Sequence, residues 1–342
     1  MIASLLGGVL FREVPEALLV GVKSGQYSVY GSIIKSVSNG EIVGHLQEAG
    51  GLSKLAGIFG SGPLGLLAGG VQMVQNEQIK SGIGRIEAGM GMLQSLGVAN
   101  LALGAAGIGV SIAGFAVVSR KIDHVKKAVE TLADRMDVVS IEVRAVRQDL
   151  VAADLDDLRA LAWAMDEGWK LGDSAAERRW HGVATDALRL SARFERHAAR
   201  ILEAGPIALP AADPMLDGLS LAGSLRVASL AAAGEVRAAQ DAANEGARDI
   251  DALTGRIGHA DLAKAKLATW KTEPGTQAWF EALTQARKLT IPDTTRLRER
   301  EAAAATRAAP LVAIEAKGIN ARDWLAAARV ETVSPLLVMM NK

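Results

Sequence analysis

The sequence of 342 residues has no cysteine, few aromatic residues and no excess of charge of either sign. The lack of cysteine excludes disulfides, thiol catalysis and cysteine-ligated zinc. Lysine and arginine together number 38, as do aspartate and glutamate, so no basic field over the whole chain attracts nucleic acid. Aromatic residues make up 4%, which disfavours a stacking platform for single strands. We therefore expect no nucleic-acid partner.

The motifs of catalytic, metal and nucleotide sites are missing or incomplete. The run GSGPLG at 60–65 has the spacing of a dinucleotide-binding turn, but Pro63 lies inside it and no alternation of strands and helices follows. No two of the five histidines are four residues apart, as a helical metal site would require. The acids of DLDDL (154–158) fit a solvated helix face. We therefore expect no enzymatic activity, no catalytic residues, no metal, no cofactor and no small-molecule substrate.

What the sequence does contain begins with a short β-like region. Residues 16–50 are rich in valine, isoleucine and tyrosine, with glycine and serine at intervals. Asn39-Gly40 separates SIIKSV from EIVGHL, and this dipeptide favours the type I′ turn of a β-hairpin. The sequence predicts a small β element of two or three strands within an N-terminal unit, 1–50.

Residues 51–119 form a glycine- and alanine-rich region with very little charge. Two apolar runs, 55–76 and 97–118, flank the polar stretch EQIKSGIGRIE, and this order predicts a helical hairpin. The second run is long enough to cross about 30 Å of hydrocarbon. Its strongly apolar side chains favour insertion by about 3–5 kcal/mol, but its polar residues and glycines oppose it, so insertion would be conditional. The predicted membrane-insertion residues are Leu101, Leu103, Gly104, Gly107, Ile108, Val110, Ile112, Phe115, Val117 and Val118.

A basic cluster follows this run directly. Arg120, Lys121, Lys126 and Lys127 are placed to contact anionic headgroups at the cytoplasmic end of a span. A helix buried in a soluble core, leading into a solvated coiled coil, explains the same pattern, and the sequence leaves both interpretations open.

From residue 120 onward the pattern is that of long amphipathic helices. Apolar residues alternate at spacings of three and four, which predicts a dry seam and one continuous helix over about 119–171, roughly 75–80 Å long. Ser174 and Glu177 predict a capping box at the start of a second helix, which runs to about residue 204. The predicted seam consists of Ile122, Val125, Val129, Leu132, Met136, Val139, Val143, Val146 and Leu150.

The remainder, 206–342, is predicted to be α-helical throughout. The proline-rich stretch GPIALPAADP predicts a loop, and a third long helix is expected from Met215 to about Leu253. Breaks at 255–258, 274–275, Pro292 and Pro310 then predict shorter helices. The fold class is therefore mainly α: an elongated bundle of long helices (120–205 and 206–342), an apolar hairpin (51–119) and the small N-terminal β element.

The apolar runs LAGIFGSGPLGLLAGG and VANLALGAAGIGVSIAGFAVV, followed by very long amphipathic helices, give residues 51–205 an architecture that resembles the α-helical pore-forming toxins of the cytolysin A type. The resemblance implies a helical bundle that shields an apolar head, then opens, inserts into a membrane and oligomerises.

Two functional hypotheses follow. The first is a conditional membrane-inserting protein, a pore-forming or membrane-disrupting toxin or defence effector, with membrane lipid and further copies of itself as partners. It would rest in the cytoplasm and move to the membrane, although secretion stays open. The second is a non-lytic coiled-coil scaffold or adaptor, either free or anchored in a membrane.

Overall fold

The computed structural model describes residues 10–11, 15–50, 122–123, 126, 130, 141–331 and 336–340. Within these ranges the chain is mainly helical and carries one small antiparallel sheet, which confirms the predicted fold class. The strands are β1 (Leu10–Phe11), β2 (Tyr27–Tyr30), β3 (Ile33–Ser36), β4 (Ile42–Glu48) and β5 (Leu336–Met340). The helices are α2 (Glu16–Lys23), α8 (Ile141–Gly168), α9 (Asp173–Leu202), the 3-10 helix η1 (Pro206–Ala208), α10 (Leu209–Ala232), α11 (Val236–Thr254), α12 (His259–Ala268), α13 (Gln277–Thr306), α14 (Ala309–Ala316) and α15 (Ala321–Val330).

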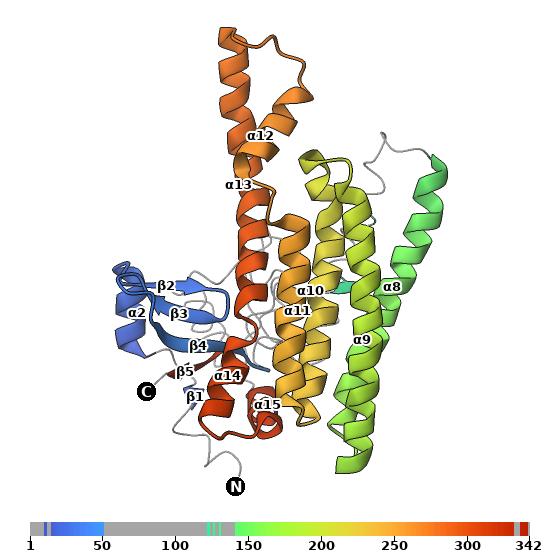
Figure 1. Ribbon diagram of the computed structural model, residues 1–342, viewed down its shortest axis with the longest axis vertical. Helices are drawn as coiled ribbons and strands as arrows, with labels where there is room; N and C mark the ends of the chain where they lie inside the picture. The colour runs from blue at the N-terminus through green and yellow to red at the C-terminus, as the bar shows by residue number, and fades with distance from the viewer. Residues whose placement is uncertain are drawn as a thin grey trace, which may run out of the picture.

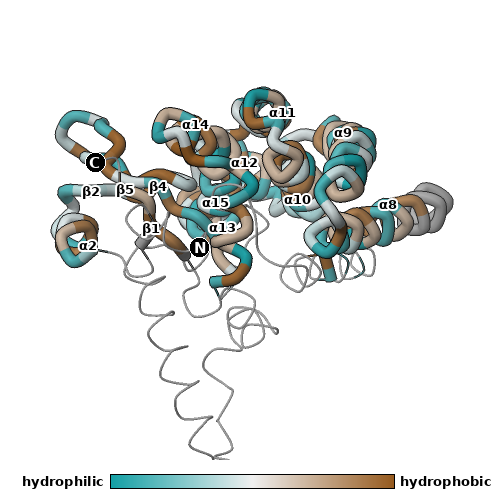
Figure 2. The backbone as a smooth tube through the Cα atoms, turned by 90° about the horizontal axis from the view of Figure 1, so that it is seen from below, coloured by the Kyte–Doolittle hydropathy of each residue, from teal (hydrophilic) through white to brown (hydrophobic). Residues whose placement is uncertain are grey.

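The long helices form a bundle in which they follow one another in the order α13, α11, α10, α9 and α8 in Figure 1, and α10 also contacts α13 and α8 directly. The sheet lies against the outer side of α13, where β2 and α13 are in contact, and α14 and α15 close the base of the bundle. Figure 2 shows the same bundle from below, with apolar and polar residues alternating along the helices. The buried apolar residues of α8, α9, α10 and α11 form one cluster, which is the main core.

α10 is the central helix, and even most of its polar residues are buried. It packs against α9, α11, α8, α13 and α15, and most of its residues are buried. α9 on its outer side is amphipathic, and its buried residues, such as Trp180, Leu190 and Phe194, recur at helical spacing. Gly218 of α10 lets the two helices approach closely, because a Cβ atom there would lie 2.6 Å from the Phe194 ring.

The predicted β element is confirmed, with two corrections. Residues 16–23 form helix α2 rather than strand. Asn39-Gly40 does lie in the turn between β3 and β4, but Gly40 has a φ of 73° whereas Asn39 has a negative φ. The turn is therefore not type I′, which needs positive φ at both central residues. Its loop is longer, and it is closed by the bond from Gly40 N to Ser36 O, 2.9 Å.

The prediction that residues 120–342 are all helical is wrong, because β5 enters the sheet. The strand order is β1-β5-β4-β3-β2, and every neighbouring pair is antiparallel. β5 lies between β1 and β4, with His45 opposite Met339. The short run LLVM is apolar, and a run of that kind fits a buried strand as well as a helix. Only the pairing with distant strands decides between them.

The prediction of one straight helix over 119–171 is also wrong. Asp123 pairs with Arg159, and Lys126 Nζ lies 3.4 Å from Asp156 Oδ1. In a straight helix those two pairs would be about 54 and 45 Å apart at 1.5 Å per residue. The helical residues near 122–130 therefore lie antiparallel to α8, and the chain reverses direction before α8 begins.

Several predicted helix boundaries also move. α9 begins at Asp173 with Gly172 as its N-cap, and no side chain caps it, so the predicted capping box is not formed. Most of the predicted proline-rich loop is the start of α10, which contains Pro214. The predicted third helix breaks at Gly234, where φ is 88° and the chain turns into α11. Pro292 lies inside α13 and does not end it.

Candidate functional site

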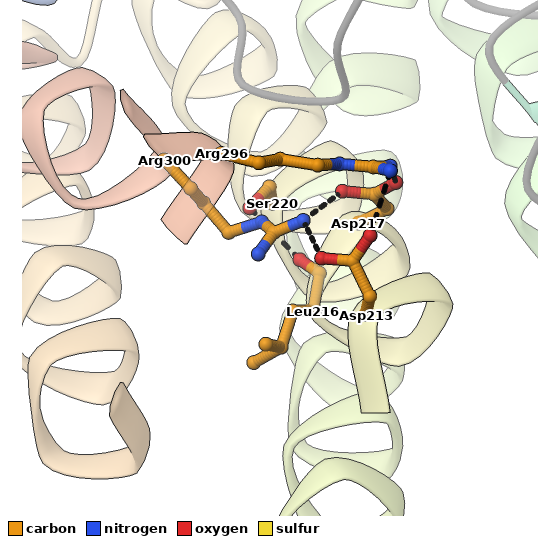
Figure 3. A network of polar contacts seen from close by, with 6 residues as sticks. All are labelled: Asp213, Leu216, Asp217, Ser220, Arg296 and Arg300. Carbon is orange, nitrogen blue, oxygen red and sulfur yellow. Dashed lines mark hydrogen bonds and ion pairs between the residues drawn. The ribbon is translucent and has the colours of Figure 1, made fainter. Parts of the chain in front are cut away.

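The most highly buried charge cluster in the described residues joins α10 to α13 (Figure 3). α10 contributes Asp213 and Asp217, and α13 contributes Arg296 and Arg300. Each pair has i,i+4 spacing, which places both side chains on one face of their helix. We call these four residues the clamp.

Each arginine of the clamp bridges both aspartates. Arg300 Nη2 lies 2.6 Å from Asp213 Oδ1 and 2.5 Å from Asp217 Oδ1. Arg296 reaches the other oxygen of each carboxylate, at 2.8 Å for Asp213 and 2.7 Å for Asp217. The side chains of Arg300 and Asp217 are 2% and 3% exposed, so this pair is shielded from solvent. All four carboxylate oxygens thus contact a guanidinium group.

Burial and charge act in opposite directions on Arg300. Burial lowers the pKa of its guanidinium, but Asp217 and then Asp213 more than offset this, so that its pKa is raised above the ordinary value. Among the described residues, Arg300 Nε and Nη1 have no hydrogen-bond partner. The charge is therefore held in place by the two aspartates alone.

Two further acids of α13 lie beside the clamp. Burial raises the pKa of Asp293, and repulsion from Asp213 raises it further. Burial also raises the pKa of Glu299, while Arg296 acts to lower it. Burial is therefore the main cause of both raised pKa values, and the acids and arginines of the clamp act on them in opposite directions.

A second buried cation lies at the C-terminal end of α13. Arg307 is 2% exposed, and burial lowers its pKa to about 10, an effect that Glu48 of β4 partly opposes. Gly223 of α10 leaves room for its guanidinium, since a Cβ atom there would lie 3.2 Å from Arg307 Nη1. Next to it, Ser32 N donates to Thr306 Oγ1 at 2.8 Å, and Ser32 Oγ donates to Thr306 O at 2.6 Å. These contacts fasten the sheet to α13.

The chemistry of the clamp is that of attachment. Because its carboxylates are already bound by guanidinium groups, neither is free to accept a proton from a substrate or to bind a cation. The described part of the chain contains no group of three or more acids or histidines placed to hold a metal ion. Buried ion pairs of this kind are costly to break from one side, since the partner is left charged and unpaired.

Most of the predicted functional residues lie outside the described residues. These are all ten membrane-insertion residues, the headgroup residues Arg120, Lys121 and Lys127, and the seam residues Val125, Val129, Leu132, Met136 and Val139. Val143 and Val146 lie within α8, but only their backbone is described.

Three of the predicted residues are placed. Lys126 pairs with Asp156 of α8, as described above. Ile122 of the seam is fully buried in the main core. Leu150 is 53% exposed, whereas its neighbour Val151 is buried together with Leu155 and Leu158. The prediction that Leu150 belongs to the seam is therefore wrong.

The clamp was not predicted from the sequence, although its spacing is a signal. Like charges at i,i+4 slightly destabilise an isolated helix, so an Asp-x-x-x-Asp pair and an Arg-x-x-x-Arg pair in two helices are candidates to face each other. The solvated-face interpretation of DLDDL was also wrong for Asp154. Asp154 is 3% exposed and lies 2.7 Å from Arg193 Nη1 and 3.2 Å from His197 Nε2.

None of the helices in the described part of the chain combines the length and the apolar character that crossing a bilayer requires. No family model, no curated protein and no solved structure matches the chain.

Proposed function

We propose that this chain is a conditional membrane-inserting protein whose working segment is the apolar region 51–119, and that it acts as a toxin or defence effector by forming pores or disrupting membranes. The observation that carries the proposal is the anchoring of this region at both ends. Ala49 and Ile122 are each fully buried and belong to the same core. Gly50 N donates to Ala328 O at 2.9 Å, which ties the preceding strand to α15.

Anchoring at both ends constrains how the segment can insert. If both anchors stay on one side of the bilayer, the chain between them must cross an even number of times. The sequence offers two apolar runs, 55–76 and 97–118, with the charged stretch 77–87 between them. A two-crossing hairpin therefore suits this segment, and residues 77–87 would reach the far side.

The clamp supplies the conditional step in this proposal. One anchor follows the sheet, which is fastened to α13 through Thr306. The other anchor is tied to α8 through the pairs Asp123–Arg159 and Lys126–Asp156, and α8 lies on the far side of α10 from α13 (Figure 1). The clamp joins α13 to α10, so its release would loosen the side of the core to which the sheet is fastened. A trigger must bind the released form better than the clamped form to shift the population.

The same proposal includes oligomerisation through the long helices, in the manner of the cytolysin A type, and membrane lipid as the partner. The resting form would be cytoplasmic, and secretion is left open. A non-lytic coiled-coil scaffold is the second candidate. The exposed Leu150 favours it, because an apolar position of the predicted seam is free to contact another chain.

Labelling of single cysteines tests the topology, and the chain suits this test because it has no native cysteine. Lys54→Cys and Ser119→Cys flank the two runs, and Ser81→Cys lies between them. After incubation with sealed liposomes, a maleimide immobilised on beads, which cannot pass through a pore, should label the two flanking positions from outside and leave Ser81→Cys unlabelled. Labelling of all three positions would contradict insertion.

Release of a dye from the same liposomes tests the activity. Gly107→Arg places a charge at the centre of the second run, where it costs about 2.5–3.5 kcal/mol, comparable to the whole insertion gain. We expect Gly107→Arg to abolish release and the matched Gly107→Ala to keep it. A folded wild-type protein that binds liposomes without emptying them would favour the scaffold instead.

A further inference from the structure

The hairpin formed by α12 and α13 projects beyond the ends of α9, α10 and α11 (Figure 1). We call its outer part, residues 269–288, the tip. It consists of the turn after α12 and the first three turns of α13. Thr276 fixes the start of α13, since its Oγ1 accepts a hydrogen bond from Trp279 N at 3.2 Å. On the side facing α12, Ala286 and Thr290 are buried. The opposite side of α13 faces solvent.

Aromatic residues gather at the tip. The chain has six tryptophans, five phenylalanines and two tyrosines, and three of these residues, Trp270, Trp279 and Phe280, lie within residues 270–280. The rings of Trp279 and Phe280 meet edge to face at 5.1 Å, and Phe280 is 54% exposed. Ile291 lies eleven residues further along the same helical face and is 51% exposed. Phe280 is thus the exposed member of the group, whereas Trp270 and Trp279 are half-buried beside it.

The charge of the hairpin is positive although that of the chain is zero. Residues 259–291 contain five basic residues, Lys264, Lys266, Lys271, Arg287 and Lys288, against three acids, Asp261, Glu273 and Glu281, an excess of two. Lys271, Arg287 and Lys288 are exposed. Lys288 and Phe280 line the same shallow pocket of about 370 Å³, together with Gln277, Glu281, Thr284 and Gln285.

We propose that the tip docks on the surface of a bilayer that contains anionic lipid. Exposed tryptophan and phenylalanine rings favour the headgroup level of a membrane, and lysine and arginine beside them attract anionic headgroups. The inference rests on the proposed function and adds the contact that would bring the protein to the lipid before insertion. It assigns that contact to the α12–α13 hairpin rather than to the basic residues beside the apolar run.

Vesicle co-sedimentation with the full chain tests the inference, using phosphatidylcholine vesicles with and without phosphatidylglycerol. We expect wild type to bind the anionic vesicles and not the neutral ones. Lys288→Glu and Phe280→Ser should each weaken binding roughly tenfold, since a single basic residue near an anionic surface contributes several-fold in affinity. Glu281→Gln should strengthen binding by removing the acid of the same face. A gain of this kind distinguishes a docking role from a structural one.

Val312→Ser and Lys317→Glu on α14 are the matched controls, because Val312 is 52% exposed and Lys317 is also exposed. Both should bind as wild type does. The inference is overturned if the tip variants, folded as judged by melting, bind like wild type, if the controls weaken binding equally, or if wild type binds neutral vesicles equally well. If wild type binds none of these lipid-only vesicles, the inference is also overturned, because lipid alone would then not be the partner of the tip.

The same vesicles separate this inference from the proposed function. Docking with a tip-dependent loss, but without any dye release by wild type, supports the inference and contradicts insertion. Gly107→Arg should still co-sediment with anionic vesicles while releasing no dye. Loss of co-sedimentation by folded Gly107→Arg would assign the contact to the apolar run and overturn the role of the tip.

Discussion

Removing one of the two arginines of the clamp should strongly destabilise the protein, because it leaves a buried aspartate without its partner. Arg300→Met keeps an unbranched side chain that covers the stem of the arginine, but it loses the guanidinium group and its charge. Asp217, 3% exposed, then shares the half-exposed Arg296 with Asp213, and one negative charge stays uncompensated. Two unit charges 4 Å apart interact by about 4 kcal/mol at an effective dielectric constant of 20. Measured losses for breaking buried pairs are about 3–5 kcal/mol, so we expect at least about 3 kcal/mol.

Urea denaturation followed by circular dichroism measures this loss, and a double-mutant cycle identifies its source. Asp217→Leu in the Arg300→Met background removes the orphaned carboxylate, so the double variant should cost about 2–3 kcal/mol less than the sum of the two single variants. Arg237→Met is the surface control, because Arg237 is 90% exposed and its nearest acid oxygen is 3.7 Å away. Its effect should stay within about 0.5 kcal/mol.

The reasoning would be refuted if Arg300→Met lost no more stability than Arg237→Met, or if the cycle were additive. Dye release from liposomes tests whether the same substitution also affects the proposed conditional step. If the clamp holds the resting form, Arg300→Met should empty liposomes at a lower protein concentration than wild type does. If Arg300→Met is destabilised as expected but empties liposomes only at the same protein concentration as wild type, the clamp does not control the conditional step.

Two further predictions concern a close contact and an acid. Gly31 has a φ of 55°, and a Cβ atom there would overlap the carbonyl oxygen of Ala302, so Gly31→Ala should cost about 2–4 kcal/mol in urea denaturation. Gly40→Ala has a similar φ of 73° but open space around it, and a loss as large as that of Gly31→Ala would contradict the role of the contact. Asp293→Asn should stabilise the protein at neutral pH, because a raised pKa makes the folded state favour the protonated carboxyl group. The gain should shrink as the pH falls and wild-type Asp293 becomes protonated, and a gain that grew in acid would contradict the sign of the shift.

The sequence predicted those features that depend on local pattern. The β3–β4 hairpin, the amphipathic α9 and the helix breaks at 255–258 and 274–275 follow from turn residues and hydrophobic spacing. The chain reversal before α8 could not be predicted in this way, since an unbroken heptad pattern fits one long helix or two antiparallel ones equally well. Asp123–Arg159 is a tertiary contact, and no local pattern determines it.

Tertiary packing also decides whether a proline or a glycine ends a helix. Pro292 lies within α13, and Pro214 lies in the second turn of α10, so each helix continues although one backbone hydrogen bond is lost at its proline. Gly234 ends α10 although alanine-rich sequence continues on both sides. The clamp joins residues 79 to 87 positions apart in the chain, so the sequence shows only the i,i+4 charge spacing within each helix.

The position of β5 within the sheet affects the order of folding during synthesis. β4 is made early, but its neighbour β5 lies roughly 290 residues later, which corresponds to about 15–60 s at the usual rate of translation. Closing a loop of that length costs about 5 kcal/mol of chain entropy, so the helices must first bring the two strands together. Until then one edge of β4 has no partner and is open to pairing with other chains. The nascent protein would thus carry an open strand edge directly before its most apolar region, and it should depend on chaperones or fast helix assembly during that interval.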